Sequence, residues 1–339
     1  MRKREAVDRV PDPWQAKESL ERALFEIRKV IAGQDVMLER VLVCLLTGGH
    51  LLIEGVPGLA KTLTVKTAAA VLGGSFKRVQ FTPDLVPSDL VGTRIFRPDR
   101  SEFETELGPV FCNFLLADEI NRAPAKVQSA LLEVMQEHQV TIGHETHYVP
   151  DPFLVMATQN PIESEGTYPL PEAQVDRFML KILVDYPLHD EELTVVHRSL
   201  AAAPELPQVL SIDELRALQQ TVDHIYVDPA LVTYSVQLAA ASRRPAEVGK
   251  PELANYIAFG ASPRGPISLI RAARALAVLR GRDYVLPQDV DELAKDALRH
   301  RLVLSYEALA EERSPDSLLD ELIAAVTPPP IDLSKPTAA

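Results

Sequence analysis

The order of hydrophobic and polar positions divides the chain into two parts that predict different secondary structure. In the first part, short apolar runs of strand length alternate with longer segments whose apolar residues recur at helical spacing. The runs predicted as strands cover residues 51–53, 79–81, 114–117, 153–158 and 178–184. The segments predicted as helices cover residues 19–31, 36–46, 62–72 and 124–138. Because strands that alternate with helices form parallel sheets, we expect residues 1–187 to form an α/β domain with a mostly parallel sheet, beginning with a polar arm at residues 1–15 and two helices.

Two stretches of this domain alternate around turn residues and predict hairpins. Residues 84–112 predict a short helix followed by strands at 92–96 and 102–107 on either side of a tight turn. Residues 139–150 predict a second hairpin around Gly143. We interpret the first hairpin as an insertion into the α/β domain.

The composition shifts after the last apolar run, and the rest of the chain contains helical segments with almost no strand signal. Residues 211–214 have the pattern of a capping box, in which a hydroxyl and a carboxylate three residues apart bind each other's backbone N–H groups. Asp228-Pro229 combines an N-cap residue with a proline in the first helical turn. We therefore expect a smaller all-helical lid domain over residues 188–327, followed by a flexible tail at 328–339.

The charge balance restricts the classes of partner. The 339 residues carry a net charge of −13, and the pI is near 5.2. Proteins that coat nucleic acid present a basic face, so the acidity disfavours a nucleic-acid remodeller. Cys44 and Cys112 lie in apolar stretches, which favours buried thiols in a reducing compartment over a disulfide. No secretory apolar region and no apolar run of about 18 residues is present, so we expect a cytoplasmic protein without a membrane span.

Residues 55–62 carry the strongest chemical signal. They have the sequence GVPGLAKT and stand between an apolar strand run and a helix, as in a phosphate-binding loop. Backbone N–H groups and the helix N-terminus attract phosphate there. We expect Lys61 to reach the β- and γ-phosphates of ATP and the Thr62 hydroxyl to bind Mg²⁺. The residues predicted to contact the nucleotide in this segment are Gly55, Pro57, Gly58, Leu59, Ala60, Lys61, Thr62 and Leu63.

Polar residues also end two later strands. Asp118 and Glu119 follow the apolar run at 114–117, and in this setting we expect Asp118 to hold Mg²⁺ and Glu119 to deprotonate the attacking water. Asn160 ends the next strand, where its amide could position that water against the γ-phosphate. Its place before Pro161 is also typical of an ordinary turn, so both interpretations of Asn160 stay open.

Three arginines are candidates for contacting phosphate. The planar guanidinium of Arg177 suits a triphosphate and could act on the ATP of a neighbouring subunit; the alternative is a surface pair with Asp176. Arg122 is a second candidate for this finger in trans. Arg264 opens a helix, where a cation opposes the helix dipole unless an anion is bound, so we interpret it as a phosphate sensor. The alternative for Arg264 is a solvated side chain.

Together these residues resemble the MoxR family of AAA+ ATPases. The resemblance rests on four stretches in one order, namely GVPGLAKT, LLADEINRAPAKVQSALLEVMQE, ATQNPIESEGTYPLPEAQVDRF and GASPRG. It implies a Walker A motif at residues 55–62 and a Walker B motif at residues 115–119. It also implies that Asn160 is sensor 1, Arg177 the arginine finger and Arg264 sensor 2. An adenine pocket that includes Ile31, Gly33 and Gln34 is implied as well.

The resemblance also implies a function. MoxR-like proteins are described as ring hexamers that hydrolyse ATP and act as chaperone-like motors on protein clients. They assemble or activate protein complexes, sometimes with metal or cofactor insertion, and often work with a partner that carries a von Willebrand A domain. The alternatives left open are the motor subunit of a metal chelatase and a nucleotide-dependent scaffold that does not hydrolyse ATP.

Overall fold

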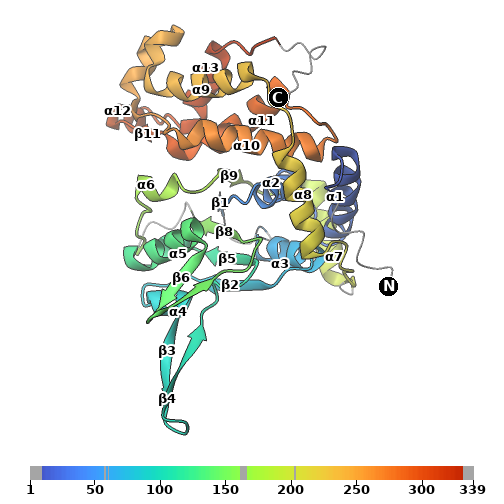
Figure 1. The fold of residues 1–339 in the computed structure, drawn as a ribbon. Helices are drawn as coiled ribbons and strands as arrows, with labels where there is room; N and C mark the ends of the chain where they lie inside the picture. The colour runs from blue at the N-terminus through green and yellow to red at the C-terminus, as the bar shows by residue number, and fades with distance from the viewer. Residues whose placement is uncertain (1–9, 57–58, 60, 161–165, 202–203, 331–339) are drawn as a thin grey trace. The chain divides into compact units, whose positions relative to one another are not determined.

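The computed structural model describes residues 10–56, 59, 61–160, 166–201 and 204–330, which divide into two compact units (Figure 1). Among these residues, unit 1 contains residue 10 and residues from 18 to 219, and unit 2 contains residues 11–17 and 220–330. The division therefore falls inside α1 (Pro13–Arg28) and α8 (Ile212–Asp223).

A five-stranded parallel sheet forms the centre of unit 1, as the sequence predicts. Its strand order is β2-β5-β8-β1-β9. The strands are β1 (Leu51–Gly55), β2 (Phe76–Gln80), β5 (Phe114–Asp118), β8 (Leu154–Gln159) and β9 (Leu180–Val184). The chain passes from β1 to the β2 edge, returns through β5 and β8, and then adds β9 on the other side of β1. The direction of the connections across the sheet therefore reverses beside β1. Open α/β sheets bind ligands at the carboxyl edge of the strands at such a switch point.

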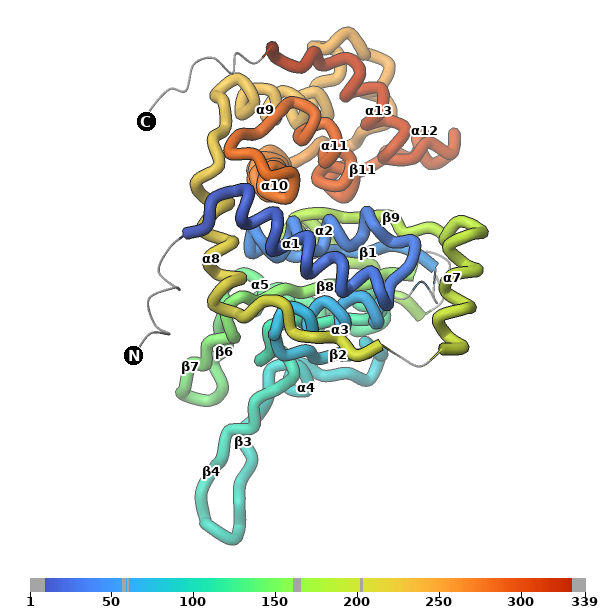
Figure 2. Tube along the Cα trace, turned by 90° about the vertical axis from the view of Figure 1, so that its right-hand side faces the viewer, coloured from blue at the N-terminus to red at the C-terminus, as the bar shows by residue number. Residues whose placement is uncertain are grey.

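Helices cover both faces of this sheet (Figure 2). The helix α3 (Lys61–Val71) connects β1 to β2, and α5 (Ala125–Glu137) connects β5 to β8 in the opposite direction across the sheet. Because such connections are right-handed, opposite directions place the two helices on opposite faces. The apolar side of α5 packs against the strands. Residues of α5 and of β5 and β8 form one core, which includes Val127, Leu131, Met135, Leu115, Val155 and Ala157. The helix α2 (Asp35–Leu46) packs against β1 and β9.

Both predicted hairpins are confirmed. After the short helix α4 (Pro87–Val91), β3 (Gly92–Arg97) pairs antiparallel with β4 (Glu102–Leu107), and Figures 1 and 2 show this hairpin projecting from the rest of unit 1. On the hairpin, the Phe96 and Phe103 rings pack with centroids 5.2 Å apart. The second hairpin pairs β6 (Gln139–Ile142) with β7 (Glu145–Tyr148).

Several boundaries differ from the sequence prediction. The helix α1 begins at Pro13, inside the predicted polar arm, because proline is well suited to a first helical turn. The edge strand β2 begins at Phe76 instead of residue 79, because its mostly exposed positions hold polar residues that break the apolar run. Unit 1 also contains short elements between the strands, η1 (Ile120–Arg122) and α6 (Glu172–Val175), and the longer α7 (His189–Leu200).

The compact units divide later in the chain than the composition shift at residue 187. Residues 188–219 belong to unit 1 because polar contacts hold them there. Arg198 Nη1 donates to the Arg28 carbonyl at 2.8 Å, and Gln219 Nε2 donates to the Leu45 carbonyl at 2.7 Å. Composition marks where strands stop, whereas packing decides which residues form one unit.

Unit 2 is helical, as predicted. Its helices are α9 (Pro229–Arg243), α10 (Arg264–Leu279), α11 (Pro287–Leu298), α12 (Tyr306–Ala310) and α13 (Pro315–Ala325). Its short elements are η2 (Pro245–Val248), η3 (Pro251–Asn255), η4 (Arg299–Arg301), β10 (Ile257–Phe259) and β11 (Val303–Leu304). The β10–β11 pair was not predicted, since strands this short leave no alternation to detect. The predicted cap is confirmed, because Asp228 Oδ1 accepts from the Ala230 N–H at 2.8 Å.

His50, directly before β1, links three elements of unit 1. Its Nδ1 accepts from the Val155 N–H at 3.1 Å, and its Nε2 lies 3.1 Å from the Met135 carbonyl. Since an N–H can only donate and a carbonyl can only accept, the proton of the neutral ring sits on Nε2. Burial lowers the pKa of His50 from 6.5 to about 4, because the charged ring is poorly solvated there.

This lowered pKa predicts acid sensitivity. Above pH 6.5 the His50 ring is neutral in both the folded and the unfolded state, so its titration costs no stability. As the pH falls toward 4, only the unfolded chain takes up the proton, and the free energy of unfolding decreases. Relative to neutral pH, the free energy of unfolding is expected to fall by about 3 kcal/mol at pH 4, because each unit of pKa difference between the two states contributes about 1.4 kcal/mol. Urea denaturation at several pH values measures it, with His50→Gln as the test variant and His197→Gln, at an exposed position of α7, as the control. Equal pH dependence in His50→Gln and the parent would contradict the prediction.

Both cysteines are buried and free, as predicted from their apolar surroundings. Burial raises the pKa of the Cys112 thiol to about 12. In the described part of the chain, no helix has the length and apolarity needed to cross a bilayer.

Candidate functional site

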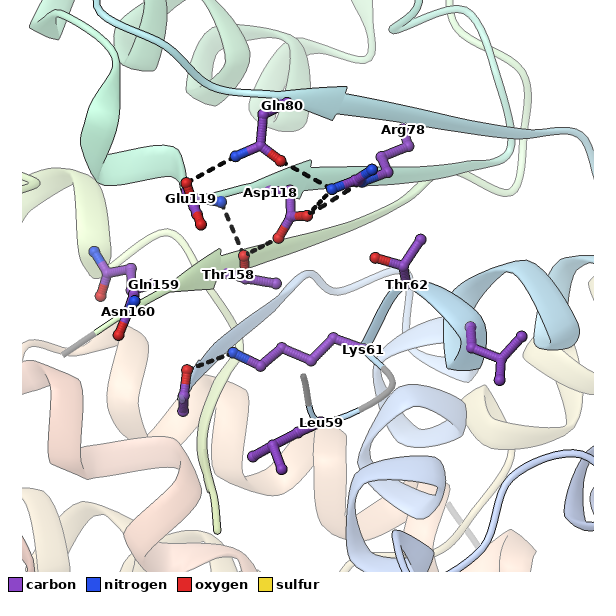
Figure 3. Close-up of a pocket in the computed structure, with 12 residues that line it drawn as sticks. Leu59, Lys61, Thr62, Arg78, Gln80, Asp118, Glu119, Thr158, Gln159 and Asn160 are labelled. Carbon is purple, nitrogen blue, oxygen red and sulfur yellow. Dashed lines mark hydrogen bonds and ion pairs between the residues drawn. The ribbon is translucent and has the colours of Figure 1, made fainter. Parts of the chain in front are cut away.

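A cavity of about 420 Å³ opens at the carboxyl edge of the sheet in unit 1. Its lining comes from the ends of four strands and the start of α3 (Figure 3). The lining residues are Gly55, Leu59, Lys61, Thr62, Leu63, Arg78, Gln80, Asp118, Glu119, Thr158, Gln159 and Asn160. The volume falls within the range of small-molecule sites.

Lys61 and Thr62 of the predicted phosphate-binding loop lie at the N-terminus of α3 and face this cavity. Lys61 Nζ donates to the Gly55 carbonyl at 2.5 Å. Glycine is required at position 55, because a Cβ there would lie 2.5 Å from the backbone oxygen of Val184. The end of β1 can therefore stay paired with β9 only if residue 55 has no side chain.

The charge on Lys61 depends on its neighbours. Partial burial lowers the pKa of its ammonium group. The carboxylates that oppose this lowering are those of Asp118, Glu119 and Glu54. An anion bound beside Lys61 would act in the same direction as these carboxylates and favour the charged form.

Both oxygens of Asp118 are engaged. Thr158 donates its hydroxyl to Oδ1 at 2.6 Å, and Arg78 donates to Oδ2 through Nη2 at 2.7 Å and Nε at 3.1 Å. The side chain of Asp118 is mostly buried, so these donors offset the cost of removing the carboxylate from water.

Glu119 is held in an unusual backbone conformation. Its φ of 55° lies in the left-handed region, which is uncommon for a residue with a side chain and is typical of functional turns. The Glu119 N–H donates to Thr158 Oγ1 at 2.9 Å. Its Oε2 accepts from Gln80 Nε2 at 2.8 Å and lies 2.9 Å from Nε of Arg122. Asp118 and Glu119 thus line one cavity, and Thr158 binds the carboxylate of the first and the backbone N–H of the second.

The other predicted site residues differ in where they lie. Asn160 is buried and lines the cavity. Ile31, Gly33 and Gln34 lie between α1 and α2 and are not among the residues that line it, so the adenine pocket stays a prediction. Three other predicted contacts fall outside the described residues, namely Pro57, Gly58 and Ala60.

The predicted trans arginine does not line the cavity of its own unit. Arg177 Nη1 donates to the Leu132 carbonyl of α5 at 3.0 Å. A residue that serves a neighbouring subunit need not line its own site, so this role stays a prediction, and so does the alternative at Arg122. Arg264 is the first residue of α10 in unit 2, and its backbone N–H donates to Ser262 Oγ at 3.1 Å. Its role as a sensor also stays a prediction.

Four residues that line the cavity have no role predicted from the sequence, namely Arg78, Gln80, Thr158 and Gln159. Arg78 and Gln80 alternate along β2, where Gln80 is in register with Asp118. Since alternate residues of a strand share a face, this spacing was the signal available once β2 had been placed beside β5. Thr158 was seen as part of a strand end, but its hydrogen bonds to two neighbouring residues become visible only with the sheet order.

The arrangement fits Mg²⁺ and a triphosphate. Thr62 and Asp118 bring a hydroxyl and a carboxylate to one cavity, and Mg²⁺ prefers such oxygen ligands. Among the residues that the structure describes, no group of three or more His, Cys, Asp or Glu side chains is placed to hold a metal alone. In proteins Mg²⁺ is usually held by one or two protein ligands together with water and substrate phosphates.

Comparisons with known proteins give the family and the fold that this chain resembles. Residues 50–180 match the ATPase family associated with various cellular activities (AAA), and residues 252–322 match the AAA lid domain. The chain is 57% identical to Chaperone MoxR1 of Mycobacterium tuberculosis over 93% of this chain and 83% of that protein. A crystal structure of a candidate ATPase from Cytophaga hutchinsonii has a TM-score of 0.88 and 47% identity, covering 93% of this chain and 96% of that one. The likeness to the Magnesium-chelatase 38 kDa subunit of Acidiphilium rubrum is more distant, at 28% identity over 68% of this chain and 63% of that subunit.

Proposed function

Because this chain belongs to the MoxR family of AAA+ ATPases, we propose that it hydrolyses ATP and uses the energy for chaperone-like remodelling, assembly or activation of protein complexes. The observation that carries the proposal is the cavity in which Lys61 and Thr62 face Asp118 and Glu119. Cationic and hydroxyl groups on one side suit phosphates and their metal, and a carboxylate on the other side suits a base for water.

Each side chain has a separate task in this proposal. Lys61 and the N-terminus of α3 bind the β- and γ-phosphates. Thr62 and Asp118 hold Mg²⁺, which when bound supplies positive charge to the phosphate oxygens. Glu119 accepts a proton from the attacking water, and Asn160 positions that water.

The bonds of Glu119 bear on this chemistry. Gln80 and Arg122 both contact Oε2, so neither contact occupies Oε1, the other oxygen with which the carboxylate can accept the proton. We propose that Arg177 reaches the γ-phosphate of a neighbouring subunit in a ring and that Arg264 links unit 2 to the nucleotide. The protein clients, and a partner with a von Willebrand A domain, belong to the same proposal.

A ring with sites completed between subunits predicts activity that depends on concentration. Specific ATPase activity is expected to rise with protein concentration and to level off once the ring has formed, because an isolated subunit lacks its neighbour's arginine. Phosphate release, measured over about a hundredfold range of protein concentration alongside sedimentation velocity, tests this. Constant specific activity while the sedimentation coefficient changes would contradict the shared site.

The motor subunit of a metal chelatase is a second candidate, favoured by the more distant likeness reported above. The two candidates differ in the protein that stimulates the ATPase. Stimulation by a chelatase catalytic subunit would favour the second candidate, and stimulation by a protein complex with no metal-inserting activity would favour the first.

A further inference from the structure

Gln128 of α5 is a buried polar side chain outside the lining of the cavity, and its hydrogen bonds set it apart. It is fully buried, and its Nε2 lies within hydrogen-bond distance of three backbone carbonyls. The acceptors are Ile120 at 3.2 Å, Ala123 at 3.1 Å and Tyr168 at 3.0 Å. Exchanging the amide oxygen and nitrogen would set an oxygen against three carbonyl oxygens, so this orientation is fixed by chemistry.

The oxygen of the same amide makes no comparable contact among the described residues. Gln128 Oε1 is buried and has no hydrogen-bond partner among the described residues. A buried acceptor without a donor costs free energy, which an apolar side chain of the same shape would avoid. The side chain is therefore explained by what its N–H groups hold.

Those N–H groups join two separate segments. Ile120 and Ala123 belong to the loop that follows Glu119 and carries Arg122, whereas Tyr168 lies on the segment that leads to Arg177. A second bond closes the same junction, since the Tyr168 N–H donates to the Asn121 carbonyl at 2.6 Å.

The segment from Tyr168 onward then follows α5 toward its C-terminus. Gln174 Nε2 donates to Ser129 Oγ at 3.1 Å, and Arg177 Nη1 donates to the Leu132 carbonyl at 3.0 Å. Polar contacts with α5 thus hold the segment from Tyr168 to Arg177 along its whole length. The loop and the arginine cannot shift independently while these contacts hold.

We propose that Gln128 is a positioning residue that fixes the Glu119 loop and the Arg177 segment to the same helix. Each subunit's own base and the arginine that it offers to its neighbour then share one rigid support. This inference rests on the proposed function for its catalytic consequence, but the tie itself can be tested without catalysis.

The first test is hydrogen exchange in Gln128→Met. Methionine has a similar shape but no donor, and Gln136→Met, an exposed position of the same helix, is the matched control. Exchange at the Arg122 and Tyr168 amides is expected to accelerate about tenfold, roughly the factor for one lost hydrogen bond, with the β6–β7 hairpin unchanged. Unchanged exchange in both segments would overturn the proposal, whatever the ATPase activity.

The second test measures the trans arginine in mixed rings. Subunits with Glu119→Gln keep Arg177, subunits with Arg177→Ala keep Glu119, and their mixture restores sites that combine the two. Adding Gln128→Met to the Glu119→Gln subunits is expected to lower the restored kcat about tenfold with KM unchanged, from the loss of one positioning hydrogen bond. Adding Gln136→Met should change nothing. Full restoration with Gln128→Met would overturn the proposal.

A failed mixture has a different meaning. If the mixture without any change at Gln128 restores no activity, the trans role of Arg177 in the proposed function fails, and hydrogen exchange alone decides on Gln128. If Gln128→Met does not fold, Gln174→Met removes the contact with Ser129 at a less buried position and replaces it in both tests. The expected directions are the same, and unchanged exchange over residues 168–177 would then overturn the proposal.

Discussion

Substitution of Glu119 by glutamine is expected to leave Mg·ATP bound and to lower kcat by about 10²–10⁴-fold, the usual contribution of a general base. The amide has nearly the same shape and can still interact with Gln80, but it cannot accept a proton from water. In the proposed mechanism Lys61 and Thr62 bind the phosphates, and both lie at the start of α3 on the other side of the cavity, so affinity is expected to be retained. Single-turnover phosphate release gives kcat, and equilibrium binding of a fluorescent ATP analogue gives affinity.

The matched control is Glu133→Gln, at an exposed position of α5. This variant makes the same chemical change away from the cavity and is expected to keep the parent rate. Hydrolysis at the parent rate in Glu119→Gln would show that the base is another residue. Loss of both binding and turnover would show that the carboxylate supports the shape of the site instead.

Replacement of Arg177 by alanine is expected to lower kcat by about 10³-fold or more, the range of an arginine finger, without weakening ATP binding. The physical reason is that a guanidinium stabilises charge that develops on the phosphoryl oxygens only in the transition state. Arg177 is absent from the lining of its own cavity, so its removal leaves the binding contacts of that unit in place.

Parallel measurements on Arg122→Ala separate the two candidate fingers. Arg122 contacts Glu119 within the same unit, so its loss should disturb the position of that carboxylate and lower kcat only modestly. Arg100→Ala, on the projecting hairpin, controls for a general loss of positive charge. A normal kcat in Arg177→Ala together with a large loss in Arg122→Ala would reverse our assignment.

The elements that position the site were predictable because each is signalled locally. Apolar runs marked β1, β5 and β8, and the polar residues that follow them identified the carboxyl edge. Parallel strands then place Lys61, Asp118 and Asn160 together, since their carboxyl ends share one edge.

The residues that were missed act through contacts distant in sequence. Arg78 and Gln80 lie on an edge strand of which only residues 79–81 were predicted, and their place beside β5 follows only from the strand register. Gln128 sits in a predicted amphipathic helix, where a polar residue reads as solvent-facing, yet it is fully buried. The extent of unit 1 also depended on hydrogen bonds from Arg198 and Gln219 that no local pattern records.

The buried thiols have a practical consequence for labelling this protein. A thiolate is the reactive form of cysteine, and the inaccessibility of Cys44 and Cys112, together with the raised pKa of the latter, shields both from maleimide dyes. The chain therefore needs no cysteine removal before site-specific labelling. A Ser101→Cys substitution in the exposed turn between β3 and β4 provides a single addressable attachment point. A fluorophore there would follow the projecting hairpin in real time during turnover.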